Sequence, residues 1–252
     1  MFILEAGINH FGNENEAKYI LNCFLKSKVE CLTFQAQTKT FYENYKKKIN
    51  FKLKNSFYKS AIKIAHKNNK KIGLAVCDLQ TAKELQNINF DFYKLLSIAI
   101  KDDKLIKYLK TKKKAVYIST GKATDKDISK CINSFGEKKK LVLLHTPMSY
   151  EKSDLNLSRI KYLNQKFNIR SGYSHHYQNV SPIPLLMPLK PNCIFIYIKG
   201  RKRKGQLFPD NKHAIYFKQL PKLLDDCVSI NAMFGKGSKA NTKIKIFDEI
   251  KI

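Results

Sequence analysis

The residues of this chain that could do chemistry form a small polar set, and each follows a short apolar run. A lysine and several serines in the set could donate hydrogen bonds to an anion. A carboxyl and an imidazole could exchange protons with a reacting group. The full set comprises Glu5, Asn9, His10, Gln35, Asp78, Lys94, Ser97, Ser119, His145, Tyr150, Ser174, His175, His176, Lys199 and Asp210. A random surface edge would not collect so many polar residues at equivalent points of the chain.

The elements that must position this set alternate along the whole chain, because short apolar runs recur between longer amphipathic segments. The apolar runs predict strands at residues 2–7, 30–35, 71–76, 92–97, 115–120, 141–146, 168–173 and 193–198. The amphipathic segments predict helices at residues 14–28, 53–69, 79–86, 102–110, 124–134, 154–167 and 218–233. Thr124 and Asp154 are predicted helix N-caps. Four prolines within residues 181–191 predict a short or irregular helix there.

Eight strands, each followed by a helix, in 252 residues predict a single (β/α)8 TIM barrel of the α/β class. A doubly wound open sheet is the alternative, but no GxGxxG or Walker motif follows any strand. In a barrel, chemistry takes place where the strands end and the next loops begin, which is where the polar set stands.

The chain is strongly basic, with 48 Lys and Arg against 20 Asp and Glu and a formal net charge of +28. Only four of the 48 are arginine, whereas proteins that read nucleic acids favour the planar arginine fork. We interpret the charge as a lysine-rich surface that binds nucleic acid only non-specifically. A dedicated nucleic-acid binder is the alternative, and in either case the field attracts anions.

The chain has no sequence features of a membrane or secreted protein. No apolar run approaches the ~20 residues of a membrane span, so no membrane partner is expected. The opening residues lack the basic stretch of a signal peptide. The six cysteines form no CxxC pair and fall in apolar patterns, which predicts free buried thiols in a reducing compartment. We therefore expect a cytoplasmic protein.

Several segments at the predicted strand ends carry a family resemblance. The opening LEAGINHFGNENEAKYIL (4–21) fits the pattern AE-x-G-x-NH-x-G followed by an acidic helix. DFYKLLS (91–97), YISTGKAT (117–124), LLHTPMSY (143–150) and GYSHH (172–176) follow in order, up to FGKGSK (234–239). Together they resemble the sialic acid synthase family, the PEP-dependent nonulosonate synthases. The resemblance implies a barrel over residues 1–240. The remaining residues, 241–252, are expected to form a short tail instead of the family's antifreeze-like domain.

This family joins the enol carbon of phosphoenolpyruvate (PEP) to the aldehyde of an N-acetylated sugar in surface-glycan biosynthesis. The resemblance implies an anion site for PEP at Lys94, Ser97, Ser119 and Ser174, and sugar contacts at Tyr150 and Asp210. Glu5 and His145 are our candidates for acid–base catalysis. The alternative for Lys94 is a strand-end lysine that reaches solvent, and for the serines it is the capping of loops. PEP and the sugar are the expected partners, and a homodimer is left open.

The resemblance also implies a divalent metal, Mn or Mg. His176 matches the family's first metal-binding histidine, and imidazole suits such ions. Alignment backwards from FPD (208–210) places Lys199 at the second histidine. A protonated ammonium does not readily ligate a metal, so we expect weak or absent specific metal binding.

Besides Lys199, the positions Thr33, Ala75, Ala99 and Met148 depart from the family pattern, and His175 stands where the pattern has an Asp. These departures define an alternative, a catalytically impaired relative that binds an acidic sugar or a partner protein without turnover. A further hypothesis gives Lys199 the role of a Schiff-base lysine. The basic run at residues 199–205 is either a solvated loop or an anion funnel at the barrel mouth. The leading prediction is a sialic acid synthase-like enzyme.

Overall fold

Eight parallel strands form the centre of the computed structural model, which describes residues 1–45, 51–202, 205 and 207–235. They are β1 (Phe2–Gly7), β2 (Cys31–Gln35), β3 (Lys71–Val76), β4 (Phe92–Leu95), β5 (Ala115–Ser119), β6 (Leu141–His145), β7 (Ser171–Ser174) and β8 (Ile194–Tyr197). Each strand pairs with the next, and β8 pairs with β1, so the sheet closes into a barrel. The predicted TIM barrel is therefore confirmed. The expected tail at 241–252 lies outside the described residues.

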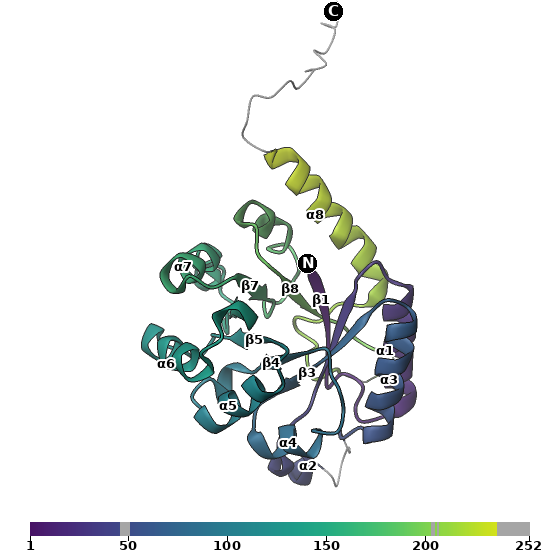
Figure 1. Ribbon diagram of the computed structural model, residues 1–252. Coiled ribbons are helices and arrows are strands. Elements are labelled where there is room, and N and C mark those ends of the chain that lie inside the picture. The colour runs from purple at the N-terminus through teal and green to yellow at the C-terminus, as the bar shows by residue number, and fades with distance from the viewer. Residues whose placement is uncertain (46–50, 203–204, 206, 236–252) are drawn as a thin grey trace, which may run out of the picture.

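Helices surround the barrel (Figure 1). The α-helices are α1 (Glu14–Lys26), α2 (Lys39–Tyr45), α3 (Asn55–Lys67), α4 (Leu79–Glu84), α5 (Asp103–Thr111), α6 (Asp125–Phe135), α7 (Arg159–Phe167) and α8 (Leu220–Phe234). Short 3-10 turns are η1 (Ser97–Ala99), η2 (Lys138–Lys140), η3 (Lys152–Leu155), η4 (Pro184–Leu189) and η5 (Phe217–Gln219). The proline-rich segment after β7 contains only η4, as predicted. No helix in the described part of the chain is long and apolar enough to cross a membrane.

The element boundaries differ most from the prediction around β7 and α7. The predicted helix at 154–167 is divided, because Asn156 adopts a left-handed conformation with φ of 36° and α7 begins only at Arg159. Asp154 lies in η3 and caps no α-helix, so that prediction is wrong. Thr124, in contrast, caps α6, where its hydroxyl accepts a hydrogen bond from the Asp127 N–H at 3.2 Å. Helix α2 was not predicted.

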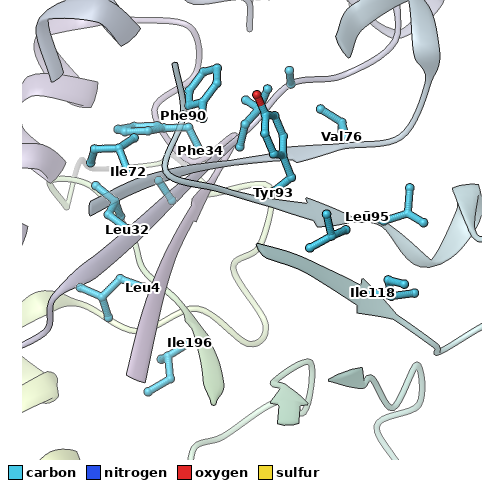
Figure 2. Close-up of a cluster of buried hydrophobic side chains, with 14 of the residues drawn as sticks. Leu4, Leu32, Phe34, Ile72, Val76, Phe90, Tyr93, Leu95, Ile118 and Ile196 are labelled. Atoms are coloured by element: carbon cyan, nitrogen blue, oxygen red, sulfur yellow. The ribbon is translucent and has the colours of Figure 1, made fainter. Parts of the chain in front are cut away.

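The main core lies between the barrel and its helices. Alternate strand residues point outward and pack beneath the helices, as Figure 2 shows for Leu4, Leu32, Ile72, Leu95, Ile118 and Ile196. These side chains are fully buried or nearly so. Five cysteines are also buried and Cys23 is half-buried, all as free thiols, which confirms that expectation.

The barrel interior changes from apolar to polar along the strands. Its apolar layer consists of Ile3, Cys31, Phe92, Tyr117, Val142, Leu144, Cys193 and Phe195. Gly73 makes room for one of these rings, because a Cβ there would lie 2.2 Å from Cε2 of Phe92. Two residues further along six of the eight strands, the inward positions become polar, whereas β3 has Ala75 and β6 has Leu144 there. We call this set the polar layer, and it consists of Glu5, Thr33, Lys94, Ser119, Ser174 and Tyr197.

Candidate active site

Lys94 lies at the centre of the polar layer and is the one fully buried lysine among the residues that the structure describes. Its Nζ donates hydrogen bonds to Oε2 of Glu5 at 2.9 Å and to Oγ of Ser174 at 3.1 Å. The same amine lies 4.6 Å from the centre of the Phe195 ring. Lys94 therefore joins β4 to β1 and β7 inside the barrel and does not reach solvent.

Two carboxyl groups near Lys94 have perturbed protonation equilibria. Oε1 of Glu5 is buried and has no hydrogen-bond partner among the described residues. Burial raises the pKa of Glu5, and the positive charge of Lys94 opposes that rise. Burial also raises the pKa of Asp210 to about 7, and the negative charge of Glu5 adds to this effect. Asp210 thus gains or loses a proton near neutral pH, which is a property of acid–base groups.

Asp210 is positioned by the first loop of the barrel. Gly7 has a positive φ of 53°, and a Cβ on it would lie only 2.6 Å from Oδ2 of Asp210. The backbone N–H of Asp210 donates to Oδ1 of Asn9 at 3.1 Å, and Nδ2 of Asn9 donates to the Ile198 carbonyl at 2.8 Å. The glycine and asparagine of the opening motif therefore connect the first loop to the last and hold Asp210 at the barrel mouth.

His176 and His213 form a pair of histidine rings at this mouth. Their ring centres lie 4.8 Å apart, and they lie 5.0 Å and 4.7 Å, respectively, from the ring centre of Tyr197. Burial lowers the pKa of His176 well below its ordinary value, and the charge of Lys94 adds to this. Burial and Lys94 also lower the pKa of His213, to about 4. These shifts favour the neutral form of both rings, in which each keeps one unprotonated nitrogen.

His213 is absent from the residues predicted from the sequence. Alignment of the eighth strand leads to Lys199 instead, whose Nζ lies 5.1 Å over the ring of Tyr216. A histidine three residues after Asp210 was the available signal, but only the path of the loop shows that it reaches His176. Within the described residues, no group of three or more His, Cys, Asp and Glu side chains is arranged to hold a metal ion.

The predicted anion-binding serines occupy three different environments. Ser174 accepts the hydrogen bond from Lys94 described above. Ser119 is buried, and its hydroxyl has no hydrogen-bond partner in the described part of the chain. The hydroxyl of Ser97 accepts a hydrogen bond from the Gly121 N–H at 3.3 Å, between the loops after β4 and β5. The structure thus brings Ser174 to Lys94 and leaves Ser119 able to bond a ligand.

His145 does not lie with Glu5. Leu144 belongs to the apolar layer inside the barrel, so His145, the next residue, points to the outer side of β6. There its Nε2 lies 2.7 Å from the carbonyl oxygen of Leu155, and its ring contacts Tyr173 with 5.9 Å between centres. The structure therefore separates the two residues expected to share acid–base catalysis, because strand alternation turns them to opposite sides of the sheet.

The predicted sugar-binding residues share one neighbourhood above the mouth. Tyr150 is 40% exposed, and Nζ of Lys212 lies 4.9 Å over its ring, two residues after Asp210. The basic run is described only in part, since 203 and 204 lie outside the described residues. Its Arg201 lies against α1, with the guanidinium 4.8 Å over the ring of Tyr19.

Known proteins resemble this chain in sequence and in fold. The chain is similar to the N,N'-diacetyllegionaminic acid synthase of Campylobacter jejuni, at 25% identity over 268 residues, 96% of this chain and 80% of that protein. It is also similar to the pseudaminic acid synthase of that species, at 34% identity over 88 residues, 33% of this chain and 26% of that protein. Its fold matches the N-acetylneuraminic acid synthetase of Leptospira borgpetersenii in complex with citrate, with a TM-score of 0.84, 23% identity, and 96% and 87% of the two chains covered. The model of the NeuB family matches residues 17–239, and the resemblance found in the sequence is thereby confirmed: the chain belongs to the NeuB family.

Proposed function

We propose that this chain condenses PEP with the aldehyde of an N-acetylated sugar, forming a nonulosonate for surface glycans. Membership of the NeuB family supports this, as does similarity over 96% of the chain to a legionaminic acid-type synthase. In the reaction, a carbon–carbon bond forms between C3 of PEP and the aldehyde carbon. Water adds to C2 of PEP, and inorganic phosphate leaves.

The observation that carries the proposal is the buried ammonium of Lys94, in the polar layer with the hydroxyls of Ser174 and Ser119. PEP carries about three negative charges, and it needs cationic and hydroxyl donors at fixed positions. In a water-excluded interior such hydrogen bonds are much stronger than in bulk water. Lys94 and Ser174 would orient the anion, and Ser119 would donate to it without giving up an existing hydrogen bond.

Glu5 is the side chain best placed to move a proton. Its Oε2 is held by Lys94, while Oε1 has no partner among the described residues and can face a reacting oxygen. Burial raises its pKa and the charge of Lys94 opposes that rise, so the carboxyl is under two opposing influences that suit a group that exchanges a proton. Glu5 would exchange a proton with the aldehyde oxygen, which becomes a hydroxyl as the carbon–carbon bond forms.

Asp210 and Tyr150 would contact the sugar from above the mouth. The Asp210 carboxylate accepts hydrogen bonds when ionised, and its Oδ2 has no partner in the described part of the chain. Tyr150 offers an exposed ring beside Lys212 for an apolar sugar face. Both groups belong to loops, where differences among relatives would select the acceptor.

A divalent metal, Mn²⁺ or Mg²⁺, fits this mouth at the His176–His213 pair, because both His213 nitrogens are buried without a hydrogen-bond partner among the described residues. Such an ion supplies Lewis-acid polarisation of the aldehyde. The two imidazoles would bind it, and Glu5 and Asp210 would offset its charge.

Phosphate release from PEP tests the proposed function. The enzyme is incubated with PEP and a panel of N-acetylated hexoses, with and without Mn²⁺, and we expect sugar-dependent phosphate release with at least one of them. Lys94→Ala should reduce kcat/KM at least tenfold, whereas Lys140→Ala, which alters a surface lysine, should leave it unchanged. PEP binding without phosphate release across the whole panel would favour the impaired relative that only binds.

A further inference from the structure

The loop after β8 brings His213 back over the barrel. The backbone N–H of Ala214 donates to the Asp210 carbonyl at 2.9 Å, and the N–H of Ile215 donates to the Tyr197 carbonyl at 2.9 Å. The second bond returns the chain to the end of β8, where Ile198 and Ile215 form a parallel bridge. His213 lies inside the turn that the first bond closes and two residues before the second bond, so its place beside the barrel mouth is fixed by backbone contacts.

The spacing of the His176 and His213 rings suits a shared ion. With metal–nitrogen bonds of about 2.1 Å and tetrahedral angles, two imidazoles on one ion have ring centres about 5 Å apart. The observed separation is 4.8 Å, with 35° between the ring planes. The edge-to-face contact with Tyr197, with 88° between the ring planes, explains why His213 is aromatic. It does not explain why a residue with two ring nitrogens is buried here.

Both His213 nitrogens are buried and lack a hydrogen-bond partner among the described residues. An unpaired buried polar group destabilises a protein, so such groups usually have a ligand or another role. Oδ1 of Asp210 lies 3.6 Å from Nε2 of His213, too far for a hydrogen bond but close enough for a carboxylate to attract a cation.

Charges of both signs lie around the pair. Lys94 acts on both rings, and Lys199 acts on His213 although its amine lies over the ring of Tyr216. Lys94 is paired with Glu5 at 2.9 Å, and Asp210 is a second carboxyl at the mouth. An ion at the pair therefore needs these two carboxyls to offset the two lysines.

We propose that His176 and His213 together bind one divalent transition-metal ion, with His213 providing the imidazole that Lys199 cannot provide at the end of the eighth strand. The remaining positions on the ion are left to water and substrate oxygen, as in catalytic metal sites generally. The expectation of weak metal binding considered Lys199 at the eighth strand alone; with His213 as a second imidazole, we expect one site instead. The role of the ion in catalysis rests on the proposed function, whereas its binding to the two histidines does not.

Metal binding is measured without PEP or sugar, so its result does not depend on turnover. Isothermal titration of the metal-free protein with Mn²⁺ should show about one site per chain. His213→Phe, which preserves the aromatic contact with Tyr197, and His176→Phe should each weaken the affinity by more than tenfold, because losing a ligand exceeds the 10–100-fold loss typical of an outer partner. Pulsed electron paramagnetic resonance of bound Mn²⁺ should detect two imidazole nitrogens in the wild type and one in each variant.

His66→Phe is the matched control, because His66 is a surface histidine beside a carboxylate, with Nε2 2.9 Å from Oδ1 of Asp91. It should bind Mn²⁺ like the wild type. Circular dichroism verifies that each variant is folded, and His213→Asn replaces His213→Phe if the latter is not. Equal Mn²⁺ affinity in wild type and a folded His213 variant, or no site in the wild type, overturns the proposal. Mn²⁺ binding without phosphate release would leave it standing and count against the proposed function alone.

Discussion

Lys94 and Glu5, 89 positions apart in the chain, form an ion pair of 2.9 Å inside the barrel. Their side chains are 1% and 0% exposed, so the pair is removed from water completely. A buried pair of this kind adds little stability compared with two apolar side chains, but removing one member leaves the other charge unpaired. The pair is therefore better explained by the chemistry of the polar layer than by the stability of the fold.

Replacing Lys94 by methionine should lower the free energy of unfolding by about 3–5 kcal/mol, because Glu5 remains buried without its cation. Urea unfolding at pH 7 measures this change. Adding Glu5→Gln to Lys94→Met should recover part of the loss. The control is Lys107→Met, which breaks the exposed pair with Asp103 and should change stability by less than about 1 kcal/mol. Similar losses in the two lysine variants would contradict the assignment of Lys94 to a dry interior.

The fold could be predicted from the sequence because it depends on local patterns. Eight apolar runs separated by amphipathic segments predict the barrel, and strand alternation predicts which side chains face its interior. Errors occurred where a local conformation overrode the pattern. At Asn156 a single left-handed residue ends the 3-10 turn, and the expected N-cap at Asp154 falls before the true helix.

The candidate site was only partly predictable, because side-chain direction and loop paths are tertiary properties. Lys94 and Ser174 were predicted individually, and the structure adds that they meet. His145 was expected to assist catalysis with Glu5, and the structure places it on the outer side of β6, opposite Leu144. His213 lies in a loop that folds back onto the end of β8 through hydrogen bonds, and no periodic pattern in the sequence indicates such contacts.

Ser119 and Ser171 provide a matched test of the PEP site. The Ser119 hydroxyl has no partner among the described residues, whereas Ser171 donates to the Ile160 carbonyl at 2.7 Å. Ser119→Ala should leave stability unchanged and weaken PEP binding roughly tenfold, the loss expected for a hydrogen bond to a charged ligand. Ser171→Ala should leave PEP binding unchanged and lower the free energy of unfolding by about 1–3 kcal/mol. Calorimetric titration measures PEP affinity and urea unfolding measures stability in both variants. An unchanged PEP affinity in Ser119→Ala would remove that serine from the site.

The raised pKa of Asp210 predicts how stability depends on pH. Its pKa is about 7 in the folded protein and 3.8 ordinarily, so the folded state binds more protons between these values. The contribution of Asp210 to stability is therefore fully present below about pH 4 and is lost as the pH rises through 7. Asp210→Asn should match the wild type at pH 4 and be more stable than it at pH 8. Urea unfolding with a chelator present measures this, and a variant less stable at pH 8 would show that the carboxylate is favoured in the fold.

The net charge of +28 and the buried anion site should respond differently to salt. A lysine-rich surface binds nucleic acid through many screened contacts, and the logarithm of its affinity for duplex DNA falls by about 0.9 per neutralised phosphate for each logarithmic unit of salt. A small anion held by Lys94 and hydroxyls of the polar layer would make few screened contacts, so its affinity should fall much less. Raising salt to physiological strength should therefore abolish most retention on duplex DNA and leave PEP binding measurable by calorimetry. Lys94→Ala should weaken PEP binding without altering DNA retention, because Lys94 is buried away from the surface. A sequence-selective complex with DNA or RNA that survives this salt would instead place the function on the surface of the protein.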